Sequence, residues 1–94
     1  MSVEDFHSEH PEPLKDGHTK ITWSPSTNRA VSIRVRRHTC GCVPTSYELC
    51  AAAGLAFIRR IVRSSAGAHV SESPWLPRAE ADKLWTALLE GWAR

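Results

Sequence analysis

Apolar and polar side chains alternate most clearly between residues 31 and 38. Every second residue from Val31 to Val35 is aliphatic, and the residues between and after them are polar or basic. This period of two predicts a half-buried β-strand. Ile21 and Trp23 lie before it, separated from it by turn formers at residues 24–28. We therefore expect residues 21–23 and 31–38 to pair as a hairpin with an aliphatic buried face and a basic open face.

Residues 46–64, SYELCAAAGLAFIRRIVRS, fit two different structures. In a helix, Thr45 and Glu48 would form a capping box. In a hairpin, residues 47–51 and 57–62 would flank a turn at Ala53-Gly54. Glycine at the centre of a helix costs about 1 kcal/mol, and the bulky residues at 57–62 favour strands. We favour the hairpin and expect residues 68–73 to return as an antiparallel strand beside residues 57–63.

The C-terminal segment has helical spacing. Its apolar side chains recur every three or four residues from Pro77 to about Trp92, at Ala81, Leu84, Trp85, Leu88 and Trp92. Pro74 and Pro77 end the sheet and begin the helix, because proline in a first helical turn loses no hydrogen bond. We expect Leu84, Trp85 and Leu88 to be the best-buried residues of the C-terminal third.

Residues 1–19 show neither helical nor strand periodicity, and they contain five acidic residues and one lysine. We interpret them as a disordered acidic tail. A chain of 94 residues has room for one hydrophobic core. Residues 20–94 are therefore expected to form a single α+β domain, a small antiparallel sheet of three to five strands packed by one C-terminal amphipathic helix.

The net charge of +2 conceals a basic middle segment. Within residues 29–63, seven arginines accompany one acidic residue, Glu48. An arginine-rich sheet face would attract an acidic partner, either nucleic acid or an acidic protein. The alternative is a solvated face without a partner. The candidate binding residues are Arg34, Arg36, Arg37, Arg59, Arg60 and Arg63.

The order strand, strand, strand, helix over residues 46–92 resembles the AP2-type and phage-integrase N-terminal DNA-binding domains. That resemblance implies a three-stranded sheet in the major groove, with Arg59, Arg60 and Arg63 as the contacting residues. The strings YELCAAAGLAFIRR and ESPWLPRAEADKLWTALLEGWAR resemble small uncharacterised actinobacterial proteins. This second resemblance implies no function.

Three cysteines lie near one another in the sequence, close to a histidine: His38, Cys40, Cys42 and Cys50. Thiolates and imidazole are ligands that zinc prefers, and a small core would gain stability from a metal. The spacing is unlike that of zinc knuckles, which come as two pairs. We therefore favour free thiols and no cofactor, with a small zinc-stabilised domain as the alternative. His7, His10 and His18 are interpreted as solvated tail residues.

The tryptophans suggest another function, protein–protein interaction. Trp85 belongs to the packing face of the predicted helix. If Trp75 and Trp92 are exposed with Leu88 between them, they form an interface for a partner or a homodimer. If they are buried, they anchor the core. The C-terminal helix surface is thus the alternative to the arginine face.

Two classes of function are disfavoured. The chain has no apolar run long enough for a membrane span and no secretory signal, so we expect a cytoplasmic protein without a membrane partner. A Cys–His pair lacks an orienting group and a pocket here, so we expect no enzyme. The expectation is a small regulatory or interaction protein.

Overall fold

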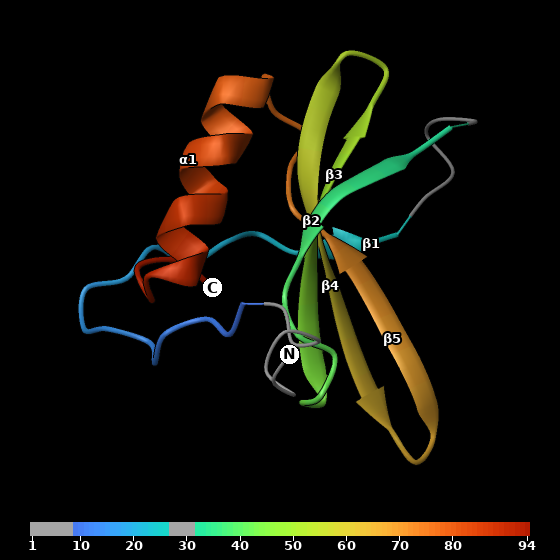
Figure 1. Ribbon diagram of the computed structural model, residues 1–94, viewed down its shortest axis with the longest axis vertical. Coiled ribbons are helices and arrows are strands. Elements are labelled where there is room, and N and C mark those ends of the chain that lie inside the picture. Colours follow the sequence, from blue (N-terminus) through green and yellow to red (C-terminus); the bar gives the residue numbers. More distant parts are fainter. Residues whose placement is uncertain (1–8, 27–31) are drawn as a thin grey trace, which may run out of the picture.

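The computed structural model describes residues 9–26 and 32–94. Within these residues the chain forms five strands and one helix: β1 (Ser24–Pro25), β2 (Arg34–His38), β3 (Thr45–Ala52), β4 (Leu55–Ser64), β5 (Gly67–Glu72) and α1 (Arg78–Leu89). The strands make one antiparallel sheet in the order β1-β5-β4-β3-β2. Helix α1 covers one face of that sheet (Figure 1). The predicted fold class, a small antiparallel sheet with one C-terminal helix, is confirmed.

The hairpin β3–β4 forms the centre of the sheet. Ala52 pairs with Leu55, which leaves Ala53 and Gly54 as a two-residue turn with φ of 51° and 78°. Two positive φ angles are typical of the type I′ turn, whose twist matches that of the flanking strands. Residues 46–64 are therefore strands rather than a helix, and β5 returns beside β4 as expected.

The predicted hairpin between residues 21–23 and 31–38 is wrong. Strand β1 pairs with β5 and β2 pairs with β3, so the two segments lie at opposite edges of the sheet. Val35 is 43% exposed, and Val31 lies outside the described residues. The reason is that alternation identifies a strand but not its partner, and an edge strand leaves one side open.

The core lies between α1 and the sheet. Leu49 of β3 and Ile58 of β4 pack there with Trp85 and Leu88, which are 2% and 0% exposed. The prediction of deep burial is confirmed for these two helix residues, whereas Leu84 is only partly buried. On the opposite face, the ring of Trp75 stacks on Phe57 with centroids 4.5 Å apart.

Residues 9–19 are held against the C-terminal end of α1, where the sequence predicts a disordered tail. Successive backbone N–H groups of Glu12, Lys15 and Thr19 donate to the carbonyls of Leu89, Gly91 and Trp92 over 2.8–2.9 Å. Figure 1 shows this segment passing around the helix end. We call residues 9–19 the N-terminal strap. Residues 1–8 lie outside the described part of the chain. Side-chain patterns carry no signal for such a segment, because backbone groups make these bonds.

The helix ends in a motif that requires glycine. Gly91 has φ of 83°, its N–H donates to the carbonyl of Leu88, and the N–H of Trp92 donates to that of Ala87. These two bonds form a Schellman motif. Arg94 donates from its guanidinium to the Leu88 carbonyl over 2.7 Å, which suits the negative end of the helix dipole. Among the described residues, no helix has both the length and the apolar character needed to cross a membrane.

Candidate functional site

Four arginines line the boundary between the edge strand β2 and helix α1. Arg34 lies opposite Ala51 and Arg37 opposite Leu49, on the helix side of the sheet. A hollow of about 400 Å³ is lined by Arg34, Arg36 and Arg78, beside the β3–β4 turn. A smaller one, of about 180 Å³, is lined by Arg36, Arg37 and Trp85 among others. Because the two hollows share Arg36, we treat them as one site, the basic groove: Arg34, Arg36, Arg37 and Arg78.

The basic groove is only slightly neutralised. Asp82 lies 3.6 Å from Arg36, and both side chains are exposed enough for solvent to weaken this pair, at 34% for Arg36 and 54% for Asp82. Within the described residues, the side chains of Arg34, Arg37 and Arg78 take part in no hydrogen bond or ion pair. The indole N–H of Trp85 is buried and has no acceptor there. The side chains of Arg34, Arg37 and Arg78 are thus free to donate to a ligand.

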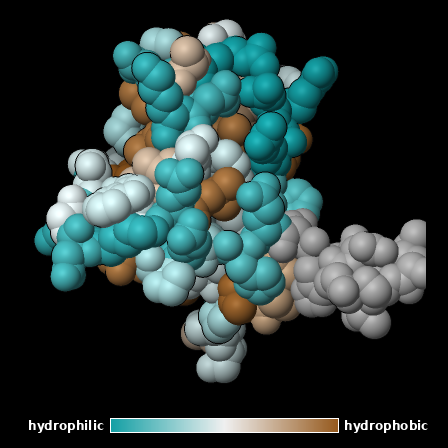
Figure 2. All heavy atoms as spheres, turned by 60° about the vertical axis from the view of Figure 1, so that its left-hand side comes forward, coloured by the Kyte–Doolittle hydropathy of each residue, from teal (hydrophilic) through white to brown (hydrophobic). Residues whose placement is uncertain are grey.

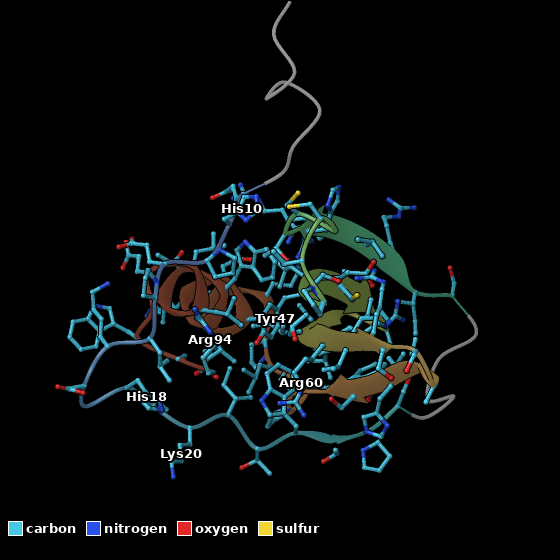
Figure 3. All side chains as sticks on the ribbon, turned by 90° about the horizontal axis from the view of Figure 1, so that it is seen from below. His10, His18, Lys20, Tyr47, Arg60 and Arg94 are labelled. Atoms are coloured by element: carbon cyan, nitrogen blue, oxygen red, sulfur yellow. The ribbon has the colours of Figure 1, made fainter. Side chains whose placement is uncertain are left out.

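The other three candidate arginines lie elsewhere. On the sheet face opposite the helix, Arg59 pairs with Glu48 at 3.0 Å, and Arg63 donates to Ser46 Oγ over 3.0 Å. Arg60 points to the helix side, where its guanidinium carbon lies 4.6 Å from the ring centroid of Trp23 (Figure 3). The six predicted arginines therefore do not form one face. The cause is geometric, because β3 separates β2 from β4 and successive residues of a strand face opposite ways.

Arg78 is the groove residue that sequence reasoning missed. In the sequence it is one of several polar residues on the solvent side of the predicted helix. Arg78 belongs to the groove because the start of α1 lies beside the β3–β4 turn and Arg34. No local pattern could have revealed that contact, because the residues are far apart in the chain.

The predicted tryptophan surface is not assembled. Trp92 is 46% exposed, but Leu88 is fully buried. Trp75 lies on the other side of the sheet, stacked on Phe57, and donates its indole N–H to Glu72 over 3.0 Å. Figure 2 shows the helix side of the molecule as mostly hydrophilic, with small separate hydrophobic patches. An isolated exposed tryptophan is ordinary for a protein surface.

A second cluster lies where the N-terminal strap meets the β2–β3 loop. His10, Cys40 and Cys42 each place a ligand atom within 4.8 Å of the others, and Cys42 Sγ lies 3.5 Å from His10 Nε2. Cys40 is buried, whereas His10 and Cys42 are exposed. A side-chain hydrogen bond with Cys40 is the main cause that raises the pKa of the Cys42 thiol above its ordinary value.

This cluster contains two of the four predicted metal ligands, Cys40 and Cys42, together with His10. His38 and Cys50 are outside the group. His38 Nδ1 lies 3.2 Å from the Thr39 carbonyl oxygen. Cys50 is fully buried in β3, and this burial raises the pKa of its thiol to about 11. The sequence predicts that His10 lies in a disordered tail, whereas the backbone hydrogen bonds of the N-terminal strap bring it to the cysteines.

Comparisons with protein-family models, with curated proteins and with solved structures found no match. What the chain does must therefore be argued from the basic groove and the cysteine cluster themselves.

Proposed function

We propose that this protein is a binding module for nucleic acid, which it holds by the phosphate backbone along the basic groove. The observation that supports the proposal is the convergence of Arg34, Arg36, Arg37 and Arg78 at the free edge of the sheet. Four guanidinium groups against the single carboxylate of Asp82 give the lining of the two hollows a net charge of +3. Such a local charge attracts polyanions.

The donors of the groove suit phosphate oxygens. A guanidinium presents parallel N–H groups that match two phosphate oxygens at once.

The rest of the lining favours backbone contacts over base recognition. Beside its arginines, the larger hollow is lined by Ser32 and by small or aliphatic residues at positions 51–55. Neither the aromatic rings that stack on bases nor the amide side chains that read base edges line it. We therefore expect binding that depends little on sequence and strongly on salt.

The test is fluorescence anisotropy of a labelled DNA duplex over a series of salt concentrations. If all four arginines contact phosphates, log affinity should fall with log salt at a slope of about −3 to −4, and each lost contact should remove about 0.9. Arg34→Ala and Arg78→Ala should each lower the slope in this way. Arg63→Ala removes the same charge from an exposed position on the opposite face and is the matched control.

Asp82→Asn should change the affinity for the duplex in the opposite direction. It frees Arg36 and removes the one carboxylate of the groove, so affinity for the duplex should rise. Equal losses in Arg34→Ala and Arg63→Ala would show that only net charge matters and would refute a defined groove. Binding of an acidic peptide with no binding of duplex or single strand at low salt would replace nucleic acid by a protein partner.

A further inference from the structure

The cluster of His10, Cys40 and Cys42 has the donor set of a zinc site, and it shares no residue with the basic groove. We propose that these three side chains bind one Zn²⁺ ion, with water at a fourth position. Two thiolates and one imidazole are ligands of the type that tetrahedral zinc takes in proteins. This site differs from the one that sequence spacing suggested, because its third ligand comes from the N-terminal strap.

The distances fit such an ion. Zinc bonds of about 2.3 Å to sulfur and about 2.1 Å to nitrogen, at a tetrahedral angle, place the two ligand atoms about 3.6 Å apart. Cys42 Sγ and His10 Nε2 are separated by 3.5 Å, and all three ligand atoms lie within 4.8 Å of one another. Small side-chain rotations are therefore enough to bring the ligands onto one ion.

Backbone hydrogen bonds preorganise the site. The N–H of Cys40 donates to the carbonyl of Glu9 over 2.9 Å, so the residue before His10 is fixed beside Cys40. Glu9 also forms a parallel bridge with Thr39. At the other side of the loop, Thr39 and Tyr47 bond to each other through the Thr39 N–H and the Thr39 hydroxyl. These bonds hold the start of the N-terminal strap and the β2–β3 loop together, and Figure 3 shows His10 at this junction.

The chemical consequence is a link between segments that are far apart in sequence. Zinc would join the start of the N-terminal strap to the loop after β2, and that strap continues over the end of α1. Since the unfolded chain lacks the assembled site, zinc binding stabilises the fold. The metal would thus hold the N-terminal strap against the rest of the domain.

The test uses the full, reduced chain freed of metal by a chelator. Titration with Co²⁺ should give one equivalent per chain, with a thiolate-to-cobalt charge-transfer band and the strong d–d absorption of a tetrahedral site, and Zn²⁺ should displace the cobalt. Loss of an outer-shell partner typically weakens metal binding by about 10–100-fold, so His10→Gln and Cys42→Ser should each weaken it by about a hundredfold or more. Zinc should also raise the melting temperature of the parent.

Matched controls use histidines outside the cluster. His18→Gln changes another residue of the same strap, and His38→Gln changes the histidine that sequence spacing suggested; both should bind metal like the parent. Circular dichroism of each variant without metal checks that the sheet is intact. Unaltered cobalt affinity in His10→Gln would overturn the proposal. So would one metal per two chains, or a reduced chain that binds no metal while air oxidation joins Cys40 to Cys42.

Discussion

Gly91 offers the sharpest test of how the N-terminal strap is attached. A methyl group built at this position would lie 2.2 Å from the backbone oxygen of Pro13 and 3.2 Å from its carbonyl carbon. The obstacle is backbone rather than a flexible side chain, so the strap itself must move. Gly91 also has φ of 83°, a conformation that alanine adopts only at a cost.

The expected loss in Gly91→Ala has two parts. The left-handed conformation costs alanine about 1 kcal/mol. Moving the strap away breaks the bonds from Glu12 N–H to the Leu89 carbonyl and from Lys15 N–H to the Gly91 carbonyl, each worth about 0.5–1.5 kcal/mol. The total is about 2–4 kcal/mol, and at about 4–8 °C per kcal/mol for a domain of this size the melting temperature should fall by roughly 8–32 °C.

Gly54→Ala is the matched control. Gly54 has φ of 78°, yet a methyl group there meets nothing within 4 Å. It should therefore lose only the conformational part, about 1 kcal/mol. Thermal unfolding followed by circular dichroism measures both variants, and hydrogen exchange of the Lys15 amide reports on the strap directly. If Gly91→Ala and Gly54→Ala have equal melting temperatures, the strap does not lie in contact with Gly91 and the reasoning is refuted.

Three further predictions concern single side chains. Leu88→Ala should lower the free energy of unfolding in urea by about 2–5 kcal/mol, because the Leu88 side chain is fully buried. Leu84→Ala should lower it by less, because Leu84 is only partly buried. Equal losses in the two variants would contradict the assigned helix face. At pH 8 the Cys50 thiol, with a pKa of about 11, is ionised to only about one part in a thousand. Iodoacetamide should therefore label the exposed Cys42 long before the buried Cys50 in the folded chain. Labelling of both thiols at equal rates would show that β3 opens readily. Ala53→Asn should stabilise the chain by about 1 kcal/mol, because Asn-Gly suits the type I′ turn, and a lower melting temperature would argue against that turn.

The sequence determined the local elements. The strand predicted by alternation in residues 31–38 is present as β2, the Ala53-Gly54 turn lies between two strands, and Trp85 and Leu88 recur on one face of α1. The helix prediction holds because the packing side chains of one element share a buried face, and such a face leaves a repeat in the sequence. Strand β2 is exposed along its whole length, so alternation identified this strand but not a buried face. The fold class follows from the order of the elements.

Only the tertiary structure decided which elements meet. The partner of β2, the separation of the arginines between two sheet faces and the entry of Arg78 into the basic groove all depend on contacts distant in sequence. The strap is the clearest case, because backbone N–H and carbonyl groups attach it, and every residue except proline carries both. Such bonds leave no pattern of side chains, so the sequence alone does not place His10 beside Cys40 and Cys42.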